Sequence, residues 1–279
     1  FGTENLLSAE EVLGNQTAFG YTAEDLELII QSMAINGKEP TFCMGDDIPL
    51  AVLSDKPRLL YDYFKQRFAQ VTNPAIDPLR ESLVMSLSMQ LGAKGNILNL
   101  KAEDAKLLKL ESPILNDEEL AGIEASDFRT QNLSTLYKIS TGPNGLKDAV
   151  AKLCEIATAA VKEGVEILVL SDRSGSHDIG TEYSYIPPLL AVGAVHHHLI
   201  RQGLRLRTSL VVDTAQCWST HHFACLIGYG ASAVCPYLTL ESVRQWWNNP
   251  KTQKLMANER IEAVSLDKAQ QNYRKSIEA

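Results

Sequence analysis

Short apolar runs alternate with longer amphipathic segments through the second half of the chain, and this alternation constrains the fold more than any other feature. The clearest run, Val165–Leu170, has the β-branched bias of a strand buried in a parallel sheet. The expected strands are Leu136–Ser140, Val165–Leu170, Arg207–Asp213 and Ser232–Cys235, and the expected helices are Gly145–Lys162, Ile186–Gln202, Ser219–Tyr229 and one beginning at Leu240. This order predicts parallel strands joined by right-handed crossovers. About four units are too few for a closed eightfold barrel, so we predict an α/β fold, with an open sheet or an incomplete TIM-like barrel.

The first part of the chain is less regular. Residues 1–133 are expected to be irregular and mostly helical, whereas residues 134–279 carry the β-α units; together, residues 1–279 are expected to form a single domain. The pattern predicts helices at Thr22–Ile35, at Arg58–Phe68 and from Asp77 onward, and short strand-like pieces at Ser86–Leu91 and Asn96–Leu98. Leu28 is expected on the apolar face of the first of these helices.

Charge and cysteine content narrow the class of protein. A net charge of -8 and an isoelectric point near 5.3 argue against a nucleic-acid-binding surface. No apolar run approaches the roughly 18–20 residues that cross a bilayer. The five scattered cysteines favour reduced thiols in a cytosol-like compartment. The start at Phe1, without a leader pattern, suggests a fragment of a larger multidomain protein or a processed product.

All six histidines lie between His177 and His222, which raises the question of a metal site. The three consecutive ones at 196–198 point about 100° apart on a helix and cannot converge on one ion. A metal-dependent hydrolase of barrel type, using His198, His222 and Asp213, remains an alternative. Structural histidines are the preferred interpretation, and we expect no metal ligands and no catalytic residues.

The loop from Ser171 to Asp178 leaves the carboxyl end of a predicted parallel strand, where α/β proteins place their sites. A barrel that binds FMN or another phosphate would use it. No glycine-rich phosphate nest is present, so a polar docking loop with Asp172 paired to Arg173 is preferred. Cys217 and His221 lie four residues apart, but no cationic neighbour favours a thiolate, so an inert thiol is expected.

Several segments together resemble the central domain of glutamate synthase, most closely the ferredoxin-dependent type. The segments that carry the resemblance are Ala18–Ile30, Met44–Glu81, Leu168–Arg173, Ile186–Arg205 and Val211–Leu238. They extend over nearly the whole chain, and the combination is specific.

The resemblance implies a role in a larger enzyme. Full-length glutamate synthase is an oxidoreductase that converts glutamine and 2-oxoglutarate to two glutamates, using FMN, an iron–sulfur cluster and, in this branch, ferredoxin. It implies that this chain connects the amidotransferase and FMN synthase domains, helps to form the ammonia tunnel, binds no cofactor itself and is inactive alone. Tunnel-lining roles carry over to Met44, Thr72 and Asn73. The expected compartment is the cytoplasm or the plastid stroma.

Overall fold

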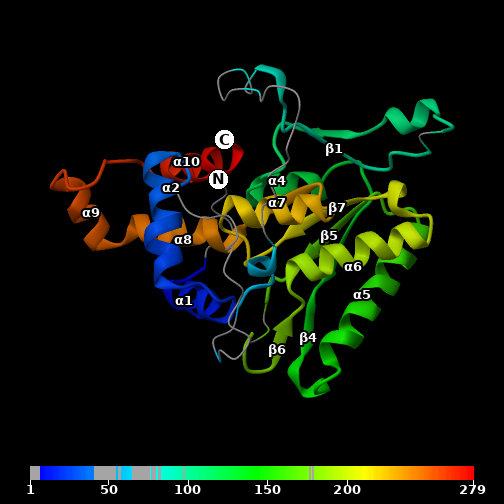
Figure 1. Cartoon of the computed structure of the whole chain (residues 1–279), viewed down its shortest axis with the longest axis horizontal. Coiled ribbons are helices and arrows are strands. Elements are labelled where there is room, and N and C mark those ends of the chain that lie inside the picture. Colours follow the sequence, from blue (N-terminus) through cyan, green and yellow to red (C-terminus); the bar gives the residue numbers. More distant parts are fainter. Residues whose placement is uncertain are drawn as a thin grey trace.

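Four parallel strands form the central sheet of the computed structural model (Figure 1). The structure describes residues 7–40, 55, 58–64, 76, 80, 83–96, 98–175, 177 and 179–279. The sheet has the order β3-β5-β7-β8, with β3 at Thr130–Ser134, β5 at Ile167–Ser171, β7 at Ser209–Asp213 and β8 at Ala233–Cys235. All three strand pairs are parallel, and the sheet does not close within the described residues. The predicted α/β class with an open sheet is therefore confirmed.

Helices cover both faces of this sheet because its inner strands, β5 and β7, are apolar on both sides. Leu168 and Leu170 of β5 face the larger core, while Ile167 and Val169 face a second core on the opposite side. The larger core holds α5 (Gly145–Lys162), α6 (Pro188–Arg201), α7 (Thr220–Gly228) and α10 (Leu266–Glu278). The second core holds α1 (Ala9–Ala18), α4 (Asp117–Glu124) and the start of α8 (Tyr237–Asn248). In Figure 1, α5 and α6 run together on one side, and α1, α2, α8 and α10 gather at the other end of the molecule.

Smaller elements complete the described chain. They are α2 (Gln31–Asn36), α9 (Pro250–Ala257), β1 (Met89–Leu91), β2 (Leu108–Leu110), β4 (Leu136–Lys138), β6 (Tyr183–Tyr185), the 3₁₀ turns η2 (Leu60–Tyr63), η3 (Ala102–Ala105), η4 (Ile139–Thr141) and η5 (Arg205–Arg207), and the π-helical turn η1 (Asp25–Ile30). Strands β1 and β2 pair with each other, as do β4 and β6, both antiparallel. Among the described residues, no helix is both long enough and apolar enough to cross a lipid bilayer.

The first strand of the parallel sheet differs from the prediction. Leu136–Ser140 was expected to be that strand, but the sheet begins at β3, and Leu136–Lys138 forms β4, which pairs with β6 outside the sheet. The sequence of β3 is mostly polar because it is an edge strand, and only Leu133 is fully buried in it. The regular β-α part of the chain therefore starts at Thr130 rather than Ser134.

The predicted helices of the first part are only partly correct. The helix at residues 22–35 forms, and the Thr22 hydroxyl accepts a hydrogen bond from the amide of Asp25 (3.1 Å). Leu28 is 64% exposed and not on the apolar face, because it lies two residues from Leu26 and from Ile30, about 200° around the helix. The helix predicted at 58–68 does not extend through Phe64, which is extended after the single turn of η2. The helix start at residue 77 lies outside the described residues. Of the expected strand-like piece Ser86–Leu91, Met89–Leu91 forms β1, which pairs with β2.

Candidate functional site

The carboxyl ends of β5 and β7 form the best-described candidate site. Ser171 and Asp213 end these strands side by side in register, so the two following loops leave the same edge of the sheet. Ligand sites of open α/β sheets lie at this edge. The three residues predicted to line a tunnel, Met44, Thr72 and Asn73, lie outside the described residues.

An ion cluster joins the two strand ends. The Arg173 guanidinium donates two hydrogen bonds to the Asp213 carboxylate, 2.7 Å from Nε and 2.9 Å from Nη2, and a further one to Asp117 at the start of α4. It also lies over the Tyr237 ring, 4.2 Å from the centroid. Burial opposes the charged form, but the Asp213 charge and hydrogen bonds outweigh it and raise the pKa of Arg173. Arg173 is therefore a fixed cation, committed to two carboxylates.

Asp172 has different partners from those expected. It was predicted to pair with Arg173, but its carboxylate accepts hydrogen bonds from the Thr214 hydroxyl and from the amide of Ala215 (2.9 Å). Only 2% of its surface is exposed, and this burial raises the pKa of Asp172 to about 7, against the lowering effect of the two donors. The Asp172 carboxylate thus holds the turn after β7. The predicted pairing was wrong because Asp213 is better placed for a bidentate contact with Arg173.

The β7 loop, Thr214–Ser219, is completely buried. Four of its successive carbonyl oxygens each accept a hydrogen bond from a hydroxyl donated by a distant part of the chain. The pairs are Tyr21 to Ala215 (2.6 Å), Tyr61 to Gln216 (3.0 Å), Thr239 to Cys217 (2.9 Å) and Tyr273 to Trp218 (3.0 Å). A buried loop needs such partners because its backbone carbonyls have no water to bind. We call these four hydroxyl groups the hydroxyl collar.

The only thiol of the β7 loop, that of Cys217, is not reactive. Cys217 has no exposed surface, and burial raises the pKa of its thiol well above the usual value. Cys225, not Cys217, contacts His221, with its sulfur 3.7 Å from Nε2, and burial raises the pKa of Cys225 as well. A nucleophilic cysteine needs a lowered pKa and an accessible sulfur. These thiols are protonated and serve as packing groups.

The structure does not bring the three candidate metal ligands together. His222 is buried against the Tyr61 ring, with centroids 4.2 Å apart, and burial lowers the pKa of His222 to about 3. Asp213 is occupied by Arg173, and His198 lies in the last turn of α6. Within the described part of the chain, no group of three or more His, Cys, Asp or Glu side chains could hold a metal ion. The hydrolase alternative has no support in this geometry.

The described residues also do not fit the cofactors that the family resemblance implies for the whole enzyme. An iron–sulfur cluster needs several converging cysteine thiolates, and no such group occurs among the described residues. An FMN phosphate needs uncommitted cations or a nest of backbone amides. At the carboxyl edge, Arg173 is neutralised by Asp213 and Asp117, so a phosphate would meet carboxylates. We derive no step through either group.

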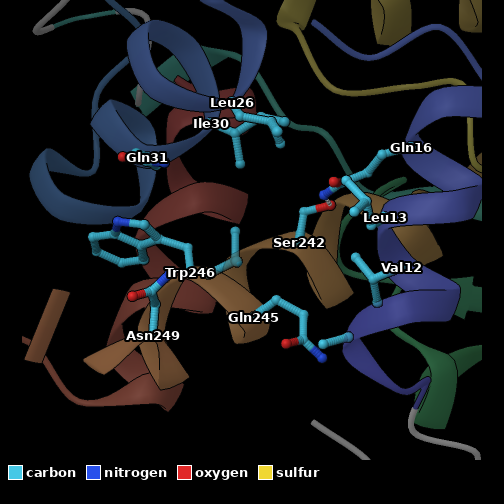
Figure 2. Close-up of a pocket in the computed structure, with 12 residues that line it drawn as sticks. Val12, Leu13, Gln16, Leu26, Ile30, Gln31, Ser242, Gln245, Trp246 and Asn249 are labelled. Atoms are coloured by element: carbon cyan, nitrogen blue, oxygen red, sulfur yellow. Dashed lines mark hydrogen bonds between the residues drawn. The ribbon is translucent and has the colours of Figure 1, made fainter. Parts of the chain in front are cut away.

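A cavity of about 260 Å³ lies away from this edge, between α1, η1 and α8. Figure 2 shows Leu13 and Gln16 of α1 on one side, Leu26 and Ile30 of η1 above, and Trp246 of α8 opposite. Its lining residues are Ala9, Val12, Leu13, Gln16, Leu26, Ile30, Gln31, Ser242, Val243, Gln245, Trp246 and Asn249. None of these side chains is an acid or a base, so the cavity offers no proton-transfer group.

Sequence reasoning missed the collar and the role of Asp117. Tyr61 and Gln216 are 155 residues apart, and Tyr21 and Ala215 are 194 apart, so no local pattern joins them. The one available signal was the polar composition of a loop bounded by buried elements, residues 214–219, because such backbone must find donors elsewhere in the chain.

Comparison with known proteins identifies the family. The protein-family model described as the glutamate synthase central domain matches residues 14–279 of this chain. Ferredoxin-dependent glutamate synthase 2 from Synechocystis sp. is 64% identical over 271 residues, which are 97% of this chain and 17% of that protein. The ferredoxin-dependent enzyme of Pyropia yezoensis is 57% identical over 279 residues, 100% of this chain and 18% of that protein. The chloroplastic ferredoxin-dependent glutamate synthase 2 of Arabidopsis thaliana is 55% identical over 274 residues, 98% of this chain and 17% of that protein.

These matches extend over essentially the whole chain, although the chain spans less than a fifth of each relative's length. They confirm the resemblance inferred from the sequence motifs: the chain belongs to the glutamate synthase central domain family.

Proposed function

We propose that this chain is the non-catalytic central connecting domain of a ferredoxin-dependent glutamate synthase. In this role it links the glutamine amidotransferase domain to the FMN synthase domain of one longer polypeptide. The observation that carries the proposal is that relatives of this type match 97–100% of the chain with 17–18% of their own length. FMN, the iron–sulfur cluster and the ferredoxin contact are then supplied by the remaining part. The compartment follows the relatives: a bacterial-type cytoplasm or the plastid stroma.

The state of the ionisable groups supports a scaffold rather than a catalyst. Arg173 is committed to Asp213 and Asp117, Cys217 is a buried neutral thiol, and His222 is held neutral by burial. General acid–base or nucleophilic catalysis requires an accessible group whose pKa is matched to the task. The groups of the carboxyl edge instead fix the loops that follow β5 and β7.

Exposed apolar side chains indicate where neighbouring domains would pack. Between residues 83 and 100, Leu83 is 84% exposed, Leu98 91% and Leu100 72%, and these residues flank β1 in the sequence. Such clustered exposure is unusual on a protein that works alone and marks interaction surfaces. A connector needs apolar surfaces of this kind toward covalently linked partners.

The proposal includes an ammonia tunnel lined by Met44, Thr72 and Asn73. Free ammonia must be kept from bulk water, which would protonate it, so the wall needs apolar, compliant side chains and few charges. Met44 has a flexible unbranched side chain suited to such a wall. Pro74 biases Asn73 toward extended backbone and brings no donor of its own. All three proposed lining positions lie outside the described residues.

The test uses the full-length product of the gene and measures glutamine hydrolysed against glutamate formed. Met44→Trp or Thr72→Trp should raise this ratio, because a bulky side chain blocks the path while hydrolysis continues. Asp127→Trp, at an exposed polar side chain, is the control and should leave the ratio unchanged. An unaltered ratio in both tunnel variants would contradict the tunnel assignment. A gene product no longer than this chain would contradict the connecting role itself.

A further inference from the structure

The two edges of the parallel sheet differ in backbone hydrogen bonding. At the β8 edge, residues 113–115 add a short parallel partner. The Leu115 amide donates to the Val234 carbonyl (2.8 Å), and the Val234 amide donates to the Pro113 carbonyl (2.7 Å). The backbone of β8 is therefore paired on both sides.

The β3 edge has no such partner among the described residues. The Thr135 amide donates to the Ser171 carbonyl (2.8 Å) and the Arg129 carbonyl accepts from the Glu166 amide (2.8 Å), so the odd-numbered residues of β3 bond to β5. In a parallel strand the bonding direction alternates, so the amides and carbonyls of Thr130, Asn132 and Ser134 point away from the sheet. No hydrogen bond within the described chain reaches these outward backbone groups.

A groove runs beside this open edge. Its volume is about 630 Å³, and β3, β4, β6 and α5 line it. Most of its surface is apolar, supplied by Leu136, Tyr137, Leu153, Ile156, Tyr183 and Ile186. Two lysines and one aspartate, Lys138, Lys152 and Asp148, add a net positive charge to its lining. An unpaired strand edge next to an apolar groove is the arrangement that binds an extended segment by strand addition.

We propose that the β3 edge and this groove bind an extended segment of the same longer polypeptide, from outside residues 1–279, as a fifth strand of the sheet. This inference rests on the proposed function, because it needs the additional chain that the relatives possess. The relatives are more than five times the length of this chain, which spans only 17–18% of them. An open edge of this kind would otherwise template aggregation, and natural proteins cover such edges.

The groove also defines the chemistry of the segment. Apolar side chains at alternate positions would enter the groove toward Leu153 and Ile156, while the backbone pairs with β3. The lysines at 138 and 152 favour a neutral or acidic segment over a basic one. The added strand would thus fasten the connecting domain to a neighbour by backbone hydrogen bonds, which depend little on the side chains of the edge.

Amide hydrogen exchange at single-residue resolution, in the full-length gene product, tests the proposal. Covered by a fifth strand, the amides of Asn132 and Ser134 should exchange within about tenfold of the rate of the Leu133 amide, which faces β5 in the parallel pairing in any case. Fast exchange at 132 and 134, with protection retained at 133, would overturn the strand addition while leaving the connecting role intact. A gene product limited to this chain would instead remove the proposed function.

A matched pair of substitutions isolates the edge amide. Asn132→Pro removes the outward N–H without touching the bonds to β5, and proline is tolerated on edge strands. Asn132→Ala loses the same side-chain contact to Glu124 but keeps the N–H. We expect the alanine variant to keep the protection of Ser134 and the proline variant to lose it. Equal protection in both variants would contradict a hydrogen-bonded strand at this edge.

A photo-crosslinking residue at position 156 identifies the occupant. The Ile156 side chain lines the groove and is 39% exposed, so the replacement needs no repacking of the core. We expect the crosslinked peptide to come from the same polypeptide, outside residues 1–279. A crosslink to residues 1–279 of a second copy, or to an unrelated protein, would overturn the assignment.

Discussion

Two loops leave adjacent strands at the same edge of the sheet, but they differ in burial. The β7 loop, residues 214–219, is buried throughout, and the hydroxyl collar binds four of its carbonyls. The β5 loop, residues 174–180, is exposed at Gly175, His177 and Gly180. The carboxyl edge of a parallel sheet is where α/β enzymes keep mobile, reactive loops. Here one of the two loops has become part of the core, which fits a connecting role better than a catalytic one.

Removing the Asp213 carboxylate, which joins the two loops through Arg173, should have the largest effect on stability. Asp213→Ala leaves the half-buried Arg173 with only Asp117, and it also removes the acceptor of the Ser171 hydroxyl. We expect a loss of about 3 kcal/mol in the free energy of unfolding, because an uncompensated cation remains near the core. Urea denaturation of residues 1–279 measures it. Asp117→Ala, at a side chain 37% exposed, should cost less than half as much, and equal losses would contradict the dominance of Asp213.

Deleting single collar hydroxyls should have the next largest effect. Tyr61→Phe and Tyr273→Phe each leave a buried carbonyl, of Gln216 or Trp218, without its donor. Each should cost about 1–3 kcal/mol of unfolding free energy, since the desolvated carbonyl finds no water. Tyr183→Phe, beside the exposed β5 loop, is the control and should change stability by less than about 0.5 kcal/mol. Comparable losses of unfolding free energy in all three variants would contradict a special stabilising role for the collar hydroxyls.

The pH dependence of stability tests the burial of Asp172. Its pKa is about 7 in the folded protein and roughly 3.9 in an unfolded chain. Between these values the folded state holds a proton that the unfolded state releases. The contribution of Asp172 is therefore complete below about pH 4 and is lost as pH rises through 7.

Asp172→Asn cannot titrate and keeps an acceptor for the Ala215 amide, so it removes this slope. The stability of the variant relative to the original chain should rise between pH 4 and 7, on the order of 1 kcal/mol per pH unit. Chemical denaturation at a series of pH values gives the difference. A difference that is independent of pH would mean that Asp172 is ionised in the folded state.

The smallest effect is expected in the β5 loop. Gly175 has a positive φ of 55°, but no atom lies within 4 Å of the position that a Cβ would take. Asparagine tolerates this backbone conformation better than other side chains. Gly175→Asn should therefore shift the unfolding free energy by less than about 0.5 kcal/mol. A loss above 1 kcal/mol in the same urea measurement would show that this loop is as constrained as its neighbour.

The regular elements of the second half were predictable because local patterns specify them. Helix α5 has the predicted bounds, Gly145–Lys162, since an amphipathic repeat runs between Pro143-Asn144 and Gly164. Strands β5, β7 and β8 agree within two residues because their side chains are apolar on both faces. The family was also recognisable from its motifs, and the comparisons confirm it.

What could not be predicted depends on contacts between distant residues. Edge strand β3 has one fully buried side chain, so its sequence resembles a polar loop. Arg173 could pair with its neighbour Asp172 or with a distant acid, and only the register of β5 with β7 decides for Asp213. The tunnel residues Met44, Thr72 and Asn73 rest on family resemblance alone and stay a prediction.

The hydroxyl collar also sets an order for folding during synthesis. Tyr273 is the last of its four hydroxyl donors to leave the ribosome, 55 residues after the Trp218 carbonyl that it binds. At about 5–20 residues per second, that carbonyl waits roughly 3–11 s for its partner. Until then the turn after the third parallel strand must stay hydrated, and helix α10 finally expels that water. A nascent chain halted before this helix would contain all four parallel strands, but its Trp218 carbonyl would lack the Tyr273 hydroxyl.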